Sequence, residues 1–141
     1  MRINKLLPWL FLLGAGGTQA AATELTCGDF LSQLGKKPTY LVYQGCQQNM
    51  ERQDQPFEAR YHVDGTHAGQ AEAYMRRTYG LPRLKRYCCA WDSSRHSWRD
   101  RRTGYGYAMV MATGETLVRT RADWPRIARF VVQVDGYAQD P

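Results

Sequence analysis

Alternation of apolar and polar side chains is clearest at residues 57–64, which read Phe-Glu-Ala-Arg-Tyr-His-Val-Asp. Every second side chain is apolar or aromatic, and the side chains between them are charged or titratable. Successive side chains of a strand point to opposite faces of a sheet. This segment therefore predicts a β-strand with one buried face and one face open to water.

Residues 105–112 show a different alternation, with Tyr and Met on one face and Gly, Ala and Val on the other. Two apolar faces are typical of a central strand, whose small-residue side we expect to lie under a helix. A Thr-Gly turn at residues 113–114 predicts a hairpin into a further strand. The other predicted strands, rich in aromatic and β-branched residues, are 39–46, 84–91, 116–121 and a last one that begins at 130 and ends near 135–136.

Two segments have the periodicity of helices. Thr26 and Asp29 have the spacing of a capping box with Thr26 as N-cap, and the apolar positions 27, 30, 31 and 34 follow on one helical face. Residues 66–79 predict the second helix, which is followed by Gly80. Residues 123–125 predict only a short helical turn or corner.

The predicted order of elements is α-β-β-α-β-β-β-β, which indicates the α+β class. We expect an antiparallel sheet of about five to six strands, with two helices packed on one of its faces and disulfides stapling the domain. Residues 23–141 are expected to form this single domain, because no linker, repeat or second apolar pattern divides them.

Residues 1–22 have the three parts of a secretory signal peptide. Arg2 and Lys5 provide the positive start, residues 6–17 are apolar, and Ala20-Ala21-Ala22 offers small residues for cleavage after Ala22. A transmembrane helix is the alternative, but 12 apolar residues are fewer than the roughly 20 that cross a bilayer. We therefore expect a periplasmic or secreted protein without stable membrane insertion after cleavage.

A lipoprotein is the variant suggested by Cys27, which lies close to the expected cut. A lipid-attachment box has Leu three positions before the cysteine, and here that position is Glu24. The mature chain is therefore not expected to be a typical lipoprotein.

All four cysteines follow the leader, and in an oxidising compartment an even count predicts two disulfides. One possible pattern joins the neighbours Cys88 and Cys89, whose Cα atoms would lie about 3.8 Å apart, closer than in most disulfides. We therefore expect Cys27 and Cys46 to be tied separately to Cys88 and Cys89, in preference to a Cys27–Cys46 bond with a vicinal Cys88–Cys89 bond.

Charge and aromatic residues gather at residues 91–107. The whole chain has a net charge of +6, which falls to +4 when Arg2 and Lys5 leave with the leader, so anionic partners are favoured. Arginine and aromatic side chains are enriched at interface hot spots and suit anionic glycans, lipids or single-stranded nucleic acid. The alternative is a solvated loop between strands. The candidate partner-binding residues are Arg95, His96, Trp98, Arg99, Arg101, Arg102 and Tyr105.

No motif in the chain indicates catalysis, a metal site or a cofactor. His62, His67 and His96 could serve as acid and base in a small hydrolase or nuclease, but their spacing does not support it. There is no Cys-x-x-Cys pair and no histidine pair at helical spacing, so no metal is expected. We expect a protein that is not an enzyme, with no catalytic residues, no metal and no cofactor.

The leader, the Cys-Gly-Asp-Phe-Leu start at residue 27, the Tyr-Cys-Cys-x-Trp stretch at residues 87–91 and the total length resemble a group of small secreted proteobacterial proteins of uncharacterised function. The resemblance covers most of the mature chain. It implies no activity and no site residues.

Three functions follow from these observations. The first is a periplasmic binding protein, specifically an immunity protein or inhibitor that binds a toxin or envelope enzyme. The second is a cell-envelope binder of anionic glycan or lipid ligands, and the third, least supported, is a small hydrolase or nuclease. No specific nucleic-acid partner is expected.

Overall fold

A computed structural model describes residues 14–17 and 24–138 of the chain. The predicted leader lies mostly outside the described residues, and so does the predicted cleavage site after Ala22. Within the described residues, no helix has both the length and the apolar character needed to cross a membrane.

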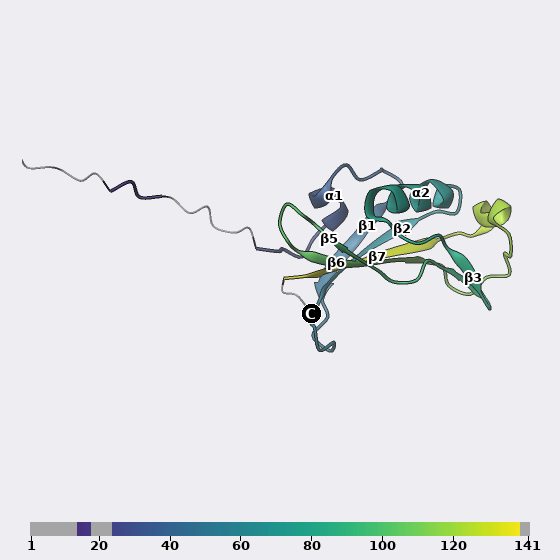
Figure 1. The fold of residues 1–141 in the computed structure, drawn as a ribbon. Coiled ribbons are helices and arrows are strands. Elements are labelled where there is room, and N and C mark those ends of the chain that lie inside the picture. The colour runs from purple at the N-terminus through teal and green to yellow at the C-terminus, as the bar shows by residue number, and fades with distance from the viewer. Residues whose placement is uncertain (1–13, 18–23, 139–141) are drawn as a thin grey trace, which may run out of the picture.

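The domain is built on one antiparallel sheet of seven strands, flanked by helices (Figure 1). Strand order across the sheet is β1-β2-β7-β6-β4-β3, and β5 pairs with β6 off this path. The strands are β1 Val42–Gln48, β2 Phe57–Val63, β3 Lys85–Tyr87, β4 Ala90–Asp92, β5 His96–Arg99, β6 Gly106–Ala112 and β7 Phe130–Tyr137. The helices are α1 Phe30–Leu34, α2 Ala68–Tyr79 and the 3-10 helix η1 Arg121–Arg126.

The α+β class is confirmed, but the sheet has seven strands where five to six were expected. The helical elements also differ from the expected pair, because α1 is only five residues long and η1 adds a third segment. In Figure 1, α1 and α2 lie on the same side of the sheet, whereas η1 lies beyond one end of it.

Strand β2 follows the alternation of its sequence. Ala59, Tyr61 and Val63 are buried, whereas Arg60 is exposed and His62 is half-buried. The last strand, β7, pairs with β2 from Phe130 to Gly136 and with β6 on its other side. This central position explains why β7 is the most buried strand of the sheet.

The core lies between the sheet and the helices. Phe30 and Leu31 of α1 are fully buried, and Met75 of α2 is buried with them against the apolar side chains of β2, β6 and β7. Phe30 packs edge-on against Tyr107 with ring centroids 5.5 Å apart. The hydroxyl of Tyr61 donates to Asp29 and accepts from Leu31 N, so this central tyrosine also fixes the start of α1.

The predicted start of the first helix was wrong by three residues. Helix α1 begins at Phe30, and its N-cap is Asp29, whose carboxylate accepts from Ser32 N at 3.2 Å. Asp29 also accepts hydrogen bonds from Lys37 and from the hydroxyl of Tyr61. Thr26 therefore lies outside the helix, because aspartate is as good an N-cap as threonine and has more partners here.

The predicted strand at residues 84–91 is a hairpin instead. Strands β3 and β4 pair antiparallel, with Tyr87 opposite Ala90, and the two cysteines form the turn between them. Cys88 adopts a positive φ of 50°, which an uninterrupted strand does not contain. The two cysteine side chains consequently do not alternate across a sheet.

Two other strand predictions need correction. Residues 96–99, treated as part of a loop, form strand β5, which pairs with β6 from Met109 to Gly106. Residues 116–121 were predicted to be a strand and are irregular, although the helical turn expected at 123–125 is present as η1. Bonds from Arg86 to the carbonyls of Thr116 and Val118 replace the ladder that a strand would have made.

The favoured disulfide pairing was also wrong. The bonds are Cys27–Cys46 and the vicinal pair Cys88–Cys89, with Cα–Cα distances of 5.6 and 3.8 Å. The reason is topological, because Cys46 lies on the edge strand β1 whereas the β3–β4 hairpin is at the opposite edge of the sheet. A disulfide spans only about 4.4–6.8 Å between Cα atoms and cannot bridge that sheet.

A partly buried ion pair joins α2 to η1. Glu72 accepts from Arg121 Nη1 and Nη2 at 2.7 and 2.9 Å and from Leu84 N at 2.8 Å. The guanidinium of Arg121 also lies 4.5 Å from the ring centroid of Trp124. This pair fixes the end of the sheet that lies away from the hairpin of β5 and β6.

Candidate binding site

The face of the sheet opposite α1 and α2 carries polar side chains at its centre. Directly paired residues share a face, so the pairing of Glu58 with Asp135, and of Asp135 with Ala108, places their side chains on the same side. Asp135 is fully buried and Glu58 is 8% exposed, although neither belongs to the apolar core. Burial of a carboxylate requires partners, and the partners here are two arginines.

Asp135 anchors both arginines. Its Oδ2 accepts from Arg52 Nη1 at 2.7 Å and from Arg95 Nη1 at 2.9 Å, and its Oδ1 accepts from Gln133 Nε2 at 2.8 Å. Arg52 comes from the β1–β2 loop, and Arg95 from the segment between β4 and β5. The buried carboxylate therefore fixes two guanidiniums that are far apart in the sequence.

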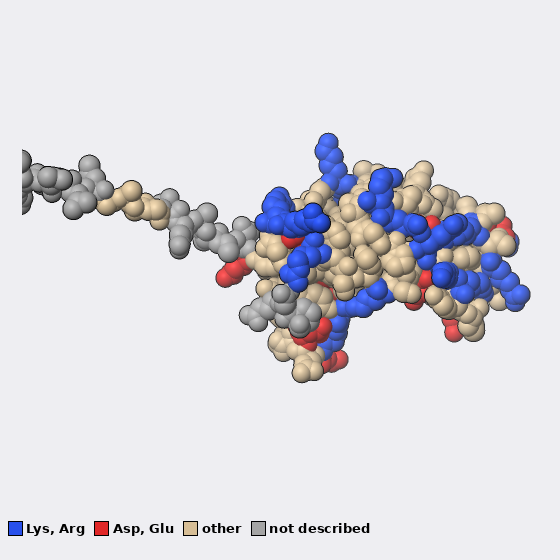
Figure 2. Space-filling view, viewed as in Figure 1, with Lys and Arg blue, Asp and Glu red and all other residues tan. Residues whose placement is uncertain are grey.

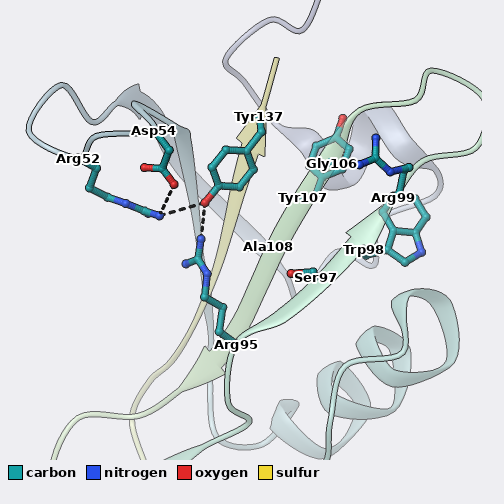
Figure 3. A pocket seen from close by; sticks show the side chains of 10 residues that line it. All are labelled: Arg52, Asp54, Arg95, Ser97, Trp98, Arg99, Gly106, Tyr107, Ala108 and Tyr137. Carbon is teal, nitrogen blue, oxygen red and sulfur yellow. Dashed lines mark hydrogen bonds and ion pairs between the residues drawn. The ribbon is translucent and has the colours of Figure 1, made fainter. Parts of the chain in front are cut away.

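Tyr137 is the second acceptor of the same two arginines. Its Oη accepts from Arg52 Nη2 at 3.0 Å and from Arg95 Nη2, and Figure 3 shows both guanidiniums directed at the phenol. Burial raises the pKa of Tyr137, and the positive charges of Arg95 and Arg52 offset this only in part. Tyr137 is therefore a neutral phenol under physiological conditions and adds no negative charge to the site.

Arg52 is also held by two further acids, Asp54 of its own loop and Glu58 of β2. Its Nη2 donates to Asp54 at 3.0 Å and its Nη1 lies 3.5 Å from Glu58 Oε1, while Asn49 Nδ2 donates to the same Glu58 oxygen at 2.9 Å. These bonds fold the β1–β2 loop onto the face opposite the helices. Arg52 is thus mainly a structural cation, whereas Arg95, whose side chain is 45% exposed, faces solvent.

A pocket of about 410 Å³ opens beside these side chains (Figure 3). This volume is in the range of small-molecule sites, and aromatic walls with a few fixed polar groups are typical of them. We call it the arginine pocket. Its lining consists of Arg52, Asp54, Arg95, Ser97, Trp98, Arg99, Gly106, Tyr107, Ala108 and Tyr137.

The accessible charge of the arginine pocket is mainly positive. Asp135 is 0% exposed, and among the described lining residues Asp54, at 30%, is the acid that reaches the rim. A guanidinium has five N–H donors, and among the described contacts of Arg95 two are used, by Asp135 and Tyr137. Donors of Arg95 therefore remain for a ligand.

The predicted binding residues do not form one surface, because β5 sends alternate side chains to opposite faces of the sheet. Arg99 pairs with Gly106 on the pocket side, its Nη1 donates to Gly104 O at 2.6 Å, and Arg95 lies on the same side. Both are in the arginine pocket.

His96 and Trp98 point the other way, toward α2. The Trp98 ring packs edge-on against Tyr79 with centroids 4.9 Å apart, and it also reaches the pocket rim. His96 lies against Gly80, where its Nε2 is 3.3 Å from the position a Cβ would take. These two side chains mainly attach β5 to the end of α2.

The remaining three predicted residues lie in the turn between β5 and β6, residues 100–105, which we call the hairpin tip. Asp100 organises it by accepting from Arg102 N at 3.1 Å and from the Thr103 hydroxyl at 2.9 Å. Arg101 and Arg102 are exposed, and Tyr105 is half-buried beside the chain that precedes α1. The hairpin tip is therefore an ordered turn that presents two arginines.

Sequence reasoning missed Arg52, Asp135 and Tyr137, which complete the pocket. One signal was present: Gln133, Asp135 and Tyr137 alternate with the buried Val132 and Val134, so three polar or amphipathic side chains fall on one face of a central strand. No sequence pattern marks Arg52 as a pocket residue, because its loop reaches Asp135 only after the sheet forms.

The three histidines are not gathered at one point. His62 and His67 line a separate shallow cleft of about 500 Å³ together with Arg129, while His96 is at α2. His67 Nδ1 lies 2.8 Å from Asp64 Oδ1, and its ring stacks on Tyr40. Burial, followed by the charge of Arg129, lowers the pKa of His62.

Among the described residues, no group of three or more histidines, cysteines and acids is placed to hold a metal ion.

These features define an α+β domain whose helix-free sheet face carries a preformed, arginine-lined pocket. The chain belongs to the family described as a domain of unknown function, DUF4952, which it matches over residues 17–91. The match ends at β4, so of the residues that line the pocket only Arg52 and Asp54 lie within it. No curated protein and no solved structure matches the chain.

Proposed function

We propose that this is an exported, non-enzymatic binding protein whose arginine pocket takes an anionic group of a cell-envelope glycan. The observation that carries the proposal is the anchoring of Arg52 and Arg95 by the buried Asp135. Two guanidiniums held in place before the ligand arrives lose little conformational freedom on binding. Arginine donors in a fixed fork match the geometry of carboxylate and phosphate groups, which are the anionic groups that we propose the glycan presents.

The shape of the site supports a glycan more than a broad protein contact. The donors lie in a concavity of about 410 Å³, which is large enough for one or two sugar units, and not on a flat surface. The ring of Tyr137 provides aromatic wall beside the arginines, and Trp98 reaches the rim from the helix side of the sheet. Figure 2 shows more lysine and arginine than acidic side chains on this face, at both ends of the domain and along its edges, which favours anionic partners in general.

The test measures binding of a heparin tetrasaccharide, with neutral dextran as the comparison ligand, by titration of tryptophan fluorescence. Arg95→Gln removes the exposed cation of the pocket, and Arg119→Gln is the matched control on an exposed arginine outside it. Loss of charge-assisted bonds predicts about a tenfold or larger loss of affinity for Arg95→Gln, against less than about twofold for the control. Equal effects of the two substitutions, or equal binding of dextran, would refute the proposal.

A protein partner is the second candidate, in the form of the immunity protein or inhibitor expected from the sequence. The observation that favours it is the hairpin tip, where Asp100 rigidly presents Arg101 and Arg102 to solvent. Affinity capture from periplasmic extract should then recover one acidic protein, and reversal of both charges with Arg101→Glu and Arg102→Glu should abolish its recovery. Recovery that is unchanged by these substitutions would remove the hairpin tip as the contact.

Export is part of the proposal and has its own test. The positive start, apolar stretch and small residues of 1–22 support cleavage after Ala22. Protein isolated from cells with its natural leader should therefore begin at Thr23, as measured by intact mass. A product that retains Met1 and fractionates with the cytoplasm would contradict export.

A further inference from the structure

The turn between β3 and β4 is made of two adjacent, bonded cysteines. Cys88 has a φ of 50°, in the left-handed region that non-glycine residues rarely adopt, and the two Cα atoms are 3.8 Å apart. Most disulfides join Cα atoms about 4.4–6.8 Å apart, and bonds outside this range are more easily reduced. Cys88 is exposed and Cys89 is half-buried, so an external thiol can reach the bond.

The turn is connected to a second surface segment, residues 116–118. Thr116 N donates to Cys89 O at 2.7 Å, and the guanidinium of Arg86 donates to the carbonyls of Thr116 and Val118. Leu117, between them, is 93% exposed. These bonds connect the turn directly to this segment.

The other disulfide has the opposite character. Cys27 and Cys46 are half-buried, lie 5.6 Å apart at Cα and close a sequence separation of 19 residues. A bond across many residues restricts the unfolded chain, whereas a bond between neighbours restricts it very little. Cys27–Cys46 thus has the properties of a structural bond, and Cys88–Cys89 has little to contribute to global stability.

We propose that Cys88–Cys89 is a thiol–disulfide exchange site whose co-substrate is the exposed dithiol of a thioredoxin-like protein. A thiolate of the dithiol attacks Sγ of Cys88, the S–S bond breaks, and Cys89 leaves as a thiolate that takes a proton from water. The second thiol of the dithiol then attacks the mixed disulfide and releases Cys88. The domain gains two electrons and two protons, and the co-substrate becomes a disulfide.

Reduction removes the constraint that closes the turn of β3 and β4, and it leaves the rest of the sheet paired as before. The consequence is local: the turn relaxes, and the bond from Thr116 N to Cys89 O is released with it. This site is distinct from the arginine pocket, and the inference does not depend on the ligand proposed there.

The experiment titrates the folded, leader-free protein with dithiothreitol, blocks free thiols with iodoacetamide and maps them by peptide mass. Cys88 and Cys89 should be alkylated together at a dithiothreitol concentration about tenfold or more below that needed for Cys27 and Cys46. Far-UV circular dichroism should stay unchanged at that point, and amide NMR shifts should be confined to residues 85–92 and 113–119.

Two double variants serve as matched controls. Cys27→Ser with Cys46→Ser should keep the low-dithiothreitol reaction, and Cys88→Ser with Cys89→Ser should lose it while remaining folded. Simultaneous reduction of both disulfides in the unaltered protein, or alkylation of Cys88 and Cys89 only after loss of the circular dichroism signal, would overturn the proposal. Peptide-mass mapping of the alkylated cysteines in the unaltered protein tests the proposal even if the Cys27→Ser, Cys46→Ser variant does not fold.

Discussion

Replacement of Asp135 by asparagine tests the central feature of the arginine pocket. The side chain keeps its size, and its amide oxygen can still accept one hydrogen bond. It loses the negative charge that Arg52 and Arg95 share at 2.7 and 2.9 Å, and its new NH₂ group meets the donor Gln133 or a guanidinium. The substitution therefore isolates the charge of a carboxylate that is 0% exposed.

The expected loss follows from the surroundings of each arginine. Stranding a charge in the interior costs about 3–5 kcal/mol. Here the cost is smaller, because Arg52 keeps Asp54 and Glu58, and Arg95 is 45% exposed and can return to water. Two charge-assisted bonds weakened to ordinary ones predict a loss of about 2 kcal/mol in the free energy of unfolding. For a domain of this size, that corresponds to a Tm lower by roughly 6–10 °C.

The assay is urea unfolding followed by tryptophan fluorescence, with binding of the heparin tetrasaccharide measured in parallel. Asp54→Asn is the matched control, since Asp54 binds Arg52 at 3.0 Å but is 30% exposed, and it should cost less than about 1 kcal/mol. Asp135→Asn should also weaken binding, because Arg95 loses its anchor.

A double-mutant cycle with Arg95→Gln completes the test. Residues that interact directly show coupling energies of about 0.5–3 kcal/mol, and we expect about 1 kcal/mol between Asp135 and Arg95. Additive effects, or a loss for Asp135→Asn no larger than for Asp54→Asn, would refute the view that Asp135 organises the pocket.

Three further outcomes are expected. Glu72→Gln should cost about 2 kcal/mol in urea unfolding, because it weakens the paired bonds from Arg121. Burial alone would raise the pKa of Glu72, but its hydrogen bonds and positive neighbours hold that pKa below 4.5. The charge of Glu72 therefore stabilises the fold above pH 4.5, and this stabilisation is lost as the pH falls through the folded pKa. In Glu72→Gln, the free energy of unfolding should consequently depend less on pH below 4.5. Loss of the Cys27–Cys46 bond by double serine substitution should cost about 3 kcal/mol on the chain-entropy estimate, measured by thermal unfolding. Gly65→Ala should cost at least about 2 kcal/mol, since its Cβ would lie 2.1 Å from Trp124 O, whereas the open helical position Gly69→Ala should be neutral or stabilising.

Local pattern was sufficient for much of the fold. The alternation of residues 57–63 specified β2, and helix α2 ends at Gly80 in the left-handed conformation that its sequence predicts. Both signals depend only on side chains within one turn or one strand. The predicted N-cap at Thr26 failed, because Asp29 gains bonds from Lys37 and Tyr61 that become available only after the chain has folded.

The candidate site was predictable only in part. The sequence pattern identified Arg95 and Arg99 as binding candidates, because they lie among aromatic residues. It could not show that His96 and Trp98 point to the opposite face of the sheet. That separation required knowledge that residues 96–99 form a strand, which depends on pairing with β6 and not on their own weak alternation.

The amino-acid sequence by itself determined the α+β class, the two principal helical segments, the alternation of β2 and the region richest in arginine and aromatic side chains. Tertiary structure alone decided the disulfide pairing, since the strand order places Cys46 and Cys88 at opposite edges of the sheet. It also determined which residues form the pocket, because Arg52 and Arg95 both contact Asp135 and Arg52 lies 83 positions before it in the sequence. Contacts at such separations depend on the register and order of strands, which no local periodicity encodes.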